Sequence, residues 1–444
     1  MTQGLFPRSF RKSYPEAVRG EGCFLYTADG KKYLDAAGSA AVVTIGHGVK
    51  EIARAMADQA ARLAYIHTSQ FRTSAAEELA RRLLALAPAN FRESGRVYFT
   101  SGGSEAAETA LKLCRQYFLE RGETKRTRIV SRWQSYHGST LGALAVSGNI
   151  RRRAPYGPLL ADWGHIPPCY CFRCPLELTY PACNVACADE LEKLLAGTGS
   201  ETVAGFICEP VVGATLGAVA PPDGYLQRIA EICRHHGILL IADEVMTGMG
   251  RTGRVLACEH WDLVPDVILL GKGIASGYAP LGAVLVSGSI AETIARGSGL
   301  FLHGFTYNAH PVATATGLAV LDHIARNRLF ERVAPAGQEL LETLQPLKRY
   351  STVGDVRGLG LLLAVEFVRN KKTHEPFPRD AGIAGRIYDA ALAAGAVTYP
   401  IQGGADGEHG DHILLAPPFT IATPEIQLLA RALETAVDSL EQGS

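Results

Sequence analysis

Residues 203–245, VAGFICEPVVGATLGAVAPPDGYLQRIAEICRHHGILLIADEV, contain the pattern that decides the fold. The apolar runs VAGFICEP (203–210) and ILLIADEV (238–245) flank the helical stretch GYLQRIAEICRHHG (224–237). Nearly continuous apolar strands separated by a helix are typical of a parallel β-sheet that is covered by helices on both faces. We therefore predict a β-α-β unit inside an α/β fold.

The same alternation extends outward from this unit. Further strands are expected in RVYFT (96–100), TRIVSR (127–132), DVILLGKG (266–273) and GAVLVSG (282–288), and a helix over 104–122. The C-terminal part has a different pattern, with one long helix over 311–333, a strand over 358–368, a loop over 399–420, and helices near 380–395 and 423–440. The first 55 or so residues hold two short strand candidates, which we expect to pack with the C-terminal part. We predict a large domain over 56–310 and a smaller α+β domain built from 1–55 and 311–444.

Composition excludes several classes of function. Lys+Arg and Asp+Glu both number 44 in 444 residues, so the formal net charge is zero and an electrostatic grip on nucleic acid or anionic lipid is not expected. No apolar run approaches the roughly 18 residues of a membrane span, and the N-terminal MTQGLFPRSFRKSYPE has no apolar signal core. Ten scattered cysteines favour a reducing compartment, so we expect a cytoplasmic enzyme.

Lys272 is the only charged residue in VILLGKGIASGYAPLGAVL (267–285), and Gly271 and Gly273 flank it. Lysine is rarely buried unless it is paired or used. A desolvated amine has a lowered pKa and becomes a nucleophile toward carbonyl groups, with which it forms a Schiff base. A lysine that reaches the surface along an apolar stem is the alternative.

Other polar residues also follow predicted strands. The turn SGGSEA (101–106) can hold an anion at a helix N-terminus or simply cap the helix through Ser104. Tyr136 can stack on a planar ligand or pack in the core. The carboxylates of Asp243 and Glu209 need a partner, either a protonated nitrogen or a metal ion. The turn would bind a phosphate, Tyr136 a flat ring, Asp243 a basic ring nitrogen and Lys272 an aldehyde. Together these four groups describe pyridoxal 5′-phosphate, whose chemistry needs a lysine and an acidic partner.

Nine motifs, in order along the chain, resemble those of the class III, fold-type I aminotransferases that depend on pyridoxal phosphate. They are GEGCFLYTADGKKYLD, GHG, SGGSEA, YHG, CEP, DEVMTGMGRTG, GKG, HGFTYNAHP and LLAPPF. The resemblance, which is closest to the ω-transaminases, implies ping-pong transfer of an amino group from a primary amine or ω-amino compound to a keto acid such as pyruvate. Racemases or epimerases, decarboxylases and phospho-lyases on the same fold are alternatives.

The resemblance also implies roles for single residues. Lys272 would hold the cofactor and shuttle the proton, Asp243 would pair with the ring nitrogen, and Glu209 would belong to the surrounding hydrogen-bond network. The remaining cofactor-binding positions are the phosphate ligands Gly102, Gly103 and Ser104, the ring contacts Tyr136, His137 and Val245, and Thr306, which would reach the phosphate of the other subunit. A homodimer with shared active sites is therefore expected, with a tetramer as an extension.

Two motifs suggest other chemistry. GMGRTG (248–253) satisfies the G-x-G-x-x-G pattern of a dinucleotide site, so an NAD-dependent oxidoreductase is a remote alternative, although the motif lies mid-chain and no clear helix follows it. Five cysteines lie between Cys169 and Cys187, and their spacing is close to that of zinc ligands. Because this segment lies outside the cofactor motifs, we favour reduced cysteines in a loop and predict no metal.

Substrate preference follows from positions that differ from the family pattern. Members that act on ornithine or 4-aminobutyrate carry a glutamate–arginine gate, and this chain has Ala214 and Leu414 at those positions. Arg357 is an alternative carboxylate anchor or a structural residue, and the loop 403–412 offers only His409 and His412 as bases. Where many amine-specific members have a bulky pair, this chain has Ala40 and Ala41, which either enlarge the substrate pocket or are compensated by neighbouring side chains.

Overall fold

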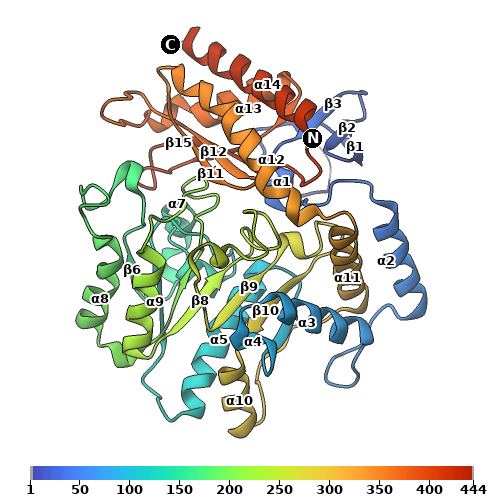
Figure 1. Cartoon of the computed structure of the whole chain (residues 1–444), viewed down its shortest axis with the longest axis vertical. Helices are drawn as coiled ribbons and strands as arrows, with labels where there is room; N and C mark the ends of the chain where they lie inside the picture. The colour runs from blue at the N-terminus through green and yellow to red at the C-terminus, as the bar shows by residue number, and fades with distance from the viewer. Residues whose placement is uncertain (1–3, 443–444) are drawn as a thin grey trace.

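A computed structural model describes residues 4–442 and contains a seven-stranded central sheet in the order β4-β10-β9-β8-β7-β5-β6 (Figure 1). These strands are β4 (Arg96–Thr100), β5 (Arg128–Arg132), β6 (His165–Ile166), β7 (Val203–Cys208), β8 (Leu239–Asp243), β9 (Val267–Leu270) and β10 (Gly282–Val286). Every neighbouring pair from β6 through β9 is parallel, whereas β10 runs antiparallel to both β4 and β9. The predicted α/β fold with a mostly parallel sheet is confirmed.

The two faces of the central sheet pack against different helices. Alternate strand residues such as Phe206 and Leu240 share a core with α9 (Tyr225–His236), and Ile207 and Ile241 share another with α5 (Gly103–Glu120). Strands buried on both faces have no polar face, which explains the continuous apolar runs in the sequence. The other helices are α1 (Gly38–Ala41), α2 (Lys50–Arg62), α3 (Ser74–Leu86), α4 (Ala89–Arg92), α6 (Leu141–Val146), α7 (Ile150–Arg153), α8 (Ala186–Thr198), α10 (Gly288–Arg296), α11 (Pro311–Arg326), α12 (Leu329–Leu344), α13 (Ile383–Ala393) and α14 (Thr423–Gln442).

A smaller unit, at the top of Figure 1, combines both ends of the chain. One of its sheets has the order β1-β2-β3-β13 and the other β11-β12-β15-β14. Their strands are β1 (Ala17–Glu21), β2 (Phe24–Thr27), β3 (Lys32–Asp35), β11 (Val353–Leu359), β12 (Leu362–Phe367), β13 (Ala396–Val397), β14 (Tyr399–Gln402) and β15 (Asp411–Leu415). Because β3 pairs in parallel with β13, this arrangement supports our proposal that 1–55 and 311–444 form one domain beside 56–310.

Several sequence predictions in this smaller unit were wrong. The single helix over 311–333 is two helices, because Arg328 takes a left-handed conformation (φ +51°) that ends the first helical segment. The strand over 358–368 is a hairpin, since Gly360 turns the chain where an added Cβ would lie 2.4 Å from the Thr252 carbonyl carbon. The loop over 399–420 contains β14 and β15, and the N-terminal part has three strands rather than two.

The buried side chain of Arg251 connects the smaller unit to the central sheet. Arg251 is 1% exposed, and its guanidinium donates hydrogen bonds to the carbonyl oxygens of Leu361 (3.1 Å), Pro417 (2.5 Å) and Val43 (3.2 Å). It also lies 4.8 Å from the ring centroid of Phe419. Burial lowers the pKa of Arg251 to about 9. This one cation therefore joins three segments of the smaller unit to the loop that follows β8.

We expect Arg251→Met to lower the free energy of unfolding by about 3 kcal/mol, because a buried carbonyl left without its donor costs about 1 to 3 kcal/mol. Urea unfolding followed by tryptophan fluorescence and circular dichroism measures the change. Arg254→Met is the matched control, since Arg254 is exposed and surface substitutions change stability by about 0.5 kcal/mol or less. Equal unfolding midpoints for the two variants would contradict this role of Arg251.

Candidate functional site

The functional residues predicted from the sequence follow strands that end at one edge of the central sheet. Asp243 is the last residue of β8, Glu209 directly follows β7, and Lys272 follows β9. Thr100, at the end of β4, pairs with Gly282 of β10, beside the end of β9, so the turn after β4 lies at the same edge. This edge, at the carboxyl ends of the parallel strands, is where α/β sheets bind ligands.

Lys272 is held in a strained, partly buried position. Its φ is +43°, a left-handed value that is unfavourable for a residue with a Cβ. Burial lowers the pKa of its amine to about 8, even though the carboxylates of Asp243 and Glu209 act in the opposite direction. The flanking glycines are required by close packing: a Cβ on Gly271 would lie 3.0 Å from Cγ1 of Val245, and one on Gly273 would lie 3.1 Å from Cβ of Met249.

Asp243 is almost completely buried, and each of its carboxylate oxygens accepts one hydrogen bond. One carboxylate oxygen accepts a hydrogen bond from the main-chain N–H of Val245 at 3.0 Å, and the other accepts one from Nδ1 of His137 at 2.7 Å. His137 is 3% exposed, and its Nε2 has no partner within residues 4–442. These two hydrogen bonds satisfy a polar group in a buried position, where an unpaired one would be costly.

Glu209 is the second buried carboxyl group at this edge. Burial raises its pKa to about 7, while the charges of His137 and Arg132 oppose that effect. Its Oε2 has no partner in the described chain. The side chain of Arg132, which is fully buried, donates from Nη2 to the main-chain oxygen of Glu209 at 2.5 Å. Sequence reasoning missed Arg132, although it is a charged residue at the end of an apolar strand.

The turn after β4 opens the helix α5 with a cradle of small residues. A Cβ on Gly103 would lie 2.8 Å from Cγ1 of Val245, whereas one on Gly102 would meet nothing within 4 Å. Oγ of Ser104 accepts a hydrogen bond from the N–H of Ser139 at 3.1 Å. The N–H groups of the first helical turn have no partner within the helix and face an anion favourably. The turn can therefore bind a phosphate group.

The side chains of Tyr136 and Arg152 contact each other. The Tyr136 side chain is half-buried, and its hydroxyl lies 2.8 Å from the hydroxyl of Ser139. The Arg152 guanidinium, which comes from α7, lies 4.6 Å from the centroid of the Tyr136 ring. Sequence reasoning missed Arg152, because it lies in the run RRR (151–153), which reads as a solvated basic segment.

Thr306 is not brought together with the other predicted residues in the single chain. It lies in an exposed loop, where the Tyr65 hydroxyl donates to its main-chain oxygen at 2.7 Å. None of the hydrogen bonds found within residues 4–442 connects it to Lys272, Asp243 or the turn after β4. An exposed side chain is compatible with the prediction that Thr306 serves a neighbouring subunit.

The alternative carboxylate anchors have structural partners. Arg357 makes a 2.7 Å ion pair with Glu366 and donates to the main-chain oxygens of Gly217 and Leu216 at 2.8 and 2.5 Å. His412 is buried and donates from Nε2 to the main-chain oxygen of Ala214 at 2.8 Å. Burial lowers the pKa of His412 to about 4, so this ring is neutral at physiological pH.

Three further positions bear on the specificity predictions. His409 is exposed and pairs with Asp406 at 2.8 Å. Residues 38–41 form a left-handed turn (φ +48° at Ser39, +76° at Ala40, +61° at Ala41). Ala41 is only 2% exposed and packs in the core, so neighbouring side chains fill the space beside it; Ala40 is half-buried.

The two motifs that suggested other chemistry have structural explanations. GMGRTG (248–253) forms consecutive turns and opens no helix, and its arginine is the buried Arg251, so the requirement of a dinucleotide site is not met. Cys171, Cys174, Cys183 and Cys187 line one small cavity of about 20 Å³. Within residues 4–442, however, no group of three or more His, Cys, Asp or Glu side chains is arranged to hold a metal ion.

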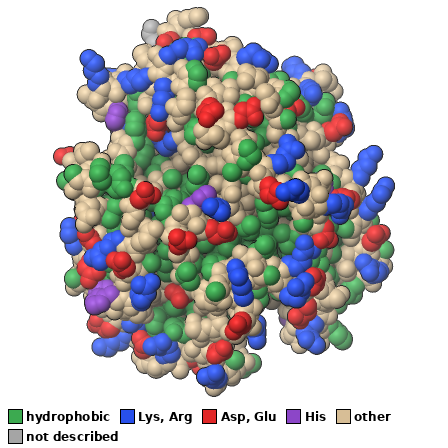
Figure 2. Space-filling model, viewed as in Figure 1, with side chains coloured by type: hydrophobic (Ala, Val, Ile, Leu, Met, Phe, Trp, Pro, Cys, Tyr) green, Lys and Arg blue, Asp and Glu red, His purple; other side chains and the backbone are tan. Residues whose placement is uncertain are grey.

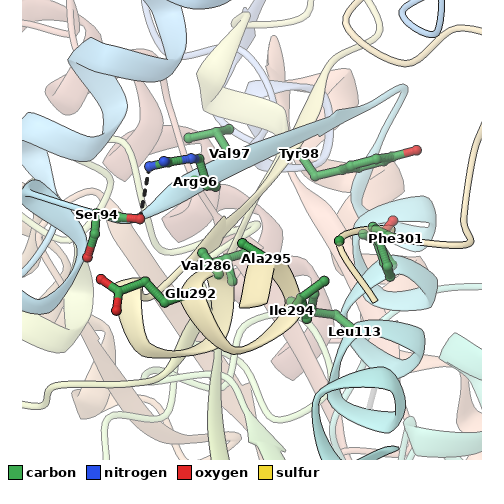
Figure 3. Close-up of a pocket in the computed structure, with 13 residues that line it drawn as sticks. Ser94, Arg96, Val97, Tyr98, Leu113, Val286, Glu292, Ile294, Ala295 and Phe301 are labelled. Atoms are coloured by element: carbon green, nitrogen blue, oxygen red, sulfur yellow. Dashed lines mark hydrogen bonds between the residues drawn. The ribbon is translucent and has the colours of Figure 1, made fainter. Parts of the chain in front are cut away.

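The larger described cavity lies elsewhere (Figure 3). It has a volume of about 340 Å³ and is lined by residues of β4, α5, α10 and the segment 299–301. The ring of Phe301 makes an edge contact with Tyr98 at 5.7 Å between centroids. Arg96 and Val286, which also line it, are paired at the end of the β4–β10 ladder remote from Thr100 and Gly282. This cavity is therefore not part of the site at the carboxyl edge.

The residues at that edge fit pyridoxal 5′-phosphate. The amine of Lys272 has no hydrogen-bond partner in the described chain and a lowered pKa. The glycine turn at 102–103 leaves space at the N-terminus of α5 for a phosphate. Asp243 offers a buried carboxylate. His137 and Glu209 each keep one unpaired buried polar atom, as expected where a polar ligand belongs.

Comparison with known proteins gives one consistent family. The model of the family "Aminotransferase class-III" matches residues 7–437. An uncharacterized aminotransferase of Bacillus subtilis (strain 168), YodT, is 40% identical over 443 residues, which is 100% of this chain and 99% of the relative. The crystal structure of an amine transaminase from an uncultivated Pseudomonas species, in its pyridoxal-phosphate-bound form, has a TM-score of 0.92, with 39% identity and 99% of both chains covered. An (S)-enantioselective ω-transaminase from Thermomicrobium roseum has a TM-score of 0.91, with 39% identity and 99% of this chain and 96% of that chain covered.

The lowered pKa of Lys272 can be measured directly. In cofactor-free protein, we expect limited acylation of Lys272 to reach half its maximum near pH 8, because only the unprotonated amine reacts and burial lowers its pKa to about 8. Lys193 is the control, since its hydrogen bond to Glu190 raises its pKa above the ordinary value. Peptide mass spectrometry reports both sites. Labelling of Lys272 that follows the same pH curve as Lys193 would show that its amine is not desolvated.

Proposed function

The chain belongs to the class III aminotransferases, which use pyridoxal phosphate, and on that premise we propose that it transfers an amino group from a primary amine or ω-amino compound to a small keto acid such as pyruvate. The observation that carries this proposal is the absence of the glutamate–arginine gate. Leu414 is 1% exposed in β15, and Ala214 offers only its main-chain oxygen, which His412 occupies. A dicarboxylate such as 2-oxoglutarate therefore lacks the gate arginine that would bind its second carboxylate.

The proposed roles of the site residues follow from their contacts. Bound pyridoxal phosphate supplies an electron sink that stabilises negative charge at the substrate carbon. Asp243, held by His137, would keep the ring nitrogen protonated through a charge-assisted hydrogen bond. The turn after β4, with Gly102, Gly103 and Ser104, would hold the phosphate at the N-terminus of α5. Val245 and Tyr136 would lie on opposite faces of the ring.

Lys272 would hold the cofactor at rest and then move the proton. Its amine, at the carboxyl edge of the sheet, would be the group that bonds to the cofactor in the absence of substrate and that moves a proton when substrate is bound. Because its pKa is lowered to about 8, a substantial fraction is unprotonated at mildly alkaline pH and can accept a proton. The carboxyl group of Glu209, whose pKa is raised to about 7, would donate or accept a hydrogen bond beside the ring. We assign no further residue to the proton transfer.

We also propose a homodimer with shared active sites. The loop that carries Thr306 exposes large apolar side chains, with Leu302 85%, Leu300 61% and Tyr307 60% exposed. The ring of Tyr65 contacts Tyr307 at 6.0 Å between centroids, so the exposed segment near residue 65 continues this surface. Contiguous exposed apolar groups of this kind mark interaction surfaces. A second copy covering the loop would place the Thr306 side chain toward the partner's phosphate site.

We propose that the enzyme acts in the cytoplasm. All ten cysteines are unpaired in the structure, as expected in a reducing compartment. No helix within residues 4–442 has the length and apolarity to cross a membrane. On the face shown in Figure 2, acidic and basic side chains are intermingled, in agreement with the balanced composition that argues against nucleic-acid partners.

The substrate proposal predicts a preference between two substrate pairs. We expect kcat/KM for an ω-amine with pyruvate to exceed that for ornithine with 2-oxoglutarate by at least tenfold, about 1.4 kcal/mol of transition-state stabilisation. Steady-state kinetics with both pairs measures the ratio, and the ornithine enzyme of any source serves as a positive control for the second assay. A tenfold preference for ornithine with 2-oxoglutarate would reverse our assignment of substrate class.

Shared sites predict complementation between two impaired variants. Lys272→Ala should lose nearly all turnover, and Thr306→Ala should retain its cofactor less well. If Thr306 serves the partner's phosphate site, a mixed dimer has one site with both lesions and one intact site, so mixing the proteins should restore activity. Native mass spectrometry confirms that subunits have exchanged. Exchange without any recovery of activity would place Thr306 outside the partner's site.

A further inference from the structure

The carboxylate of a keto acid needs a cationic side chain to bind it. Most cationic side chains near the site already have hydrogen-bond or ion-pair partners within the chain. Arg357 is paired with Glu366, Arg251 donates to three main-chain oxygens, and Arg132 donates to the oxygen of Glu209. His412 is neutral at physiological pH, because burial lowers its pKa to about 4. These four groups therefore have structural partners or carry no charge, which leaves the substrate carboxylate without a binding residue among them.

Arg152 differs from these cations, because its guanidinium has no hydrogen bond or ion pair in the described chain. It is half-buried, and the face of the Tyr136 ring lies 4.6 Å away from it. Arg153, the next residue, has partners within the chain, because its Nη1 donates to the main-chain oxygens of Leu144, Ala145 and Ser147 at 2.9, 2.5 and 3.0 Å. A half-buried guanidinium with its donors free requires an acceptor from outside the chain or from water.

The helix α7, which carries Arg152, packs against the smaller unit. Neighbouring residues of α7 lie against the tip of the β14–β15 hairpin: a Cβ on Gly407 would lie 2.5 Å from Cδ1 of Ile150, and one on Gly403 would lie 3.3 Å from Cδ of Arg151. On the other side, Arg152 is close enough to Lys272 to contribute to its lowered pKa, for which burial is the main cause. Arg152 thus lies between the hairpin of the smaller unit and the reactive amine.

We propose that Arg152 binds the carboxylate of the keto-acid substrate, and that this contact, rather than a gate arginine, selects monocarboxylate keto acids. The inference rests on the proposed function, since it assigns a residue to the acceptor of that reaction. A guanidinium presents two parallel N–H donors that match the two oxygens of a carboxylate. The Tyr136 ring supports the planar guanidinium through a cation–π contact, so the cation is oriented before substrate arrives.

The experiment compares two acceptors that differ in the carboxylate. Pyruvate and propanal are similar in size, but only pyruvate is charged. With Arg152→Met in the pyridoxal-phosphate-loaded enzyme, we expect kcat/KM for pyruvate to fall at least tenfold, mainly through KM, and that for propanal to change less than threefold. Arg152→Lys should recover part of the pyruvate activity, since it keeps the charge but not the paired donors. Arg151→Met is the matched control, because it removes a neighbouring charge from the same helix.

A binding measurement separates the proposal from the reaction itself. Propionate carries a carboxylate but no carbonyl, so calorimetry with the loaded enzyme should detect its binding to the wild type and to Arg151→Met, and not to Arg152→Met. Equal losses with pyruvate and propanal would instead assign Arg152 to the positioning of Tyr136 and overturn the proposal, as would undiminished propionate binding in Arg152→Met. A wild-type enzyme that binds propionate through Arg152 but does not turn over pyruvate would contradict the proposed function while supporting the carboxylate site.

Discussion

Burial of ionisable groups at one edge of the central sheet is the constraint on which the rest of the site depends. Lys272, Asp243 and Glu209 end or follow apolar strands that have no polar face, so water cannot compensate their charges. Each of the three groups accommodates its burial in a different way. The amine of Lys272 loses its proton more readily, Glu209 keeps its proton to a higher pH, and Asp243 stays hydrogen-bonded to His137. The lysine and the glutamate thereby acquire pKa values of about 8 and about 7, close to those needed for proton transfer.

The two gate positions, Leu414 and Ala214, lie where the smaller unit meets the central domain, apart from this arrangement of charges. At the gate position Ala214, the main-chain oxygen accepts a hydrogen bond from His412. Arg357, the other candidate anchor for a substrate carboxylate, is paired with Glu366. Both interactions are buried and use main-chain or carboxylate acceptors, so neither group is available to a substrate. A half-buried cation outside the smaller unit, Arg152, remains with free donors. If Arg152 binds the acceptor as we propose, selectivity depends on α7 and not on the residues at the carboxyl edge of the sheet.

The central sheet could be predicted from the sequence, because its strands are buried on both faces and read as continuous apolar runs between amphipathic helices. The smaller unit was harder to predict. A single left-handed residue, Arg328, divides a helical pattern whose amphipathicity continues on both sides, and Gly360 folds an apolar run into a hairpin. β15 was read as part of a loop, because a glycine-rich tip precedes it, although it lies in the middle of its sheet. These errors arise where tertiary contacts override the local pattern.

The residues of the site also divide into those that the local sequence indicates and those that it does not. Lys272, Asp243 and Glu209 could be found because a charge at the end of an apolar run is conspicuous. Arg132 has a comparable position but was not predicted, and the role of Arg357 depends on its ion pair with Glu366 in the neighbouring strand. Arg152 was missed because nothing in a run of three arginines distinguishes the one that contacts the Tyr136 ring from the one that donates to main-chain oxygens. Such distinctions depend on contacts between distant segments.

The three acceptors of Arg251 have a consequence for how this architecture can diverge. All of them are main-chain oxygens, of Val43, Leu361 and Pro417. A main-chain oxygen is present whatever side chain the residue carries. The hydrogen bonds by which Arg251 connects the two units therefore do not depend on which amino acid stands at the three acceptor positions. Side chains at these positions can therefore be exchanged without loss of the three hydrogen bonds by which Arg251 holds the smaller unit beside the central sheet.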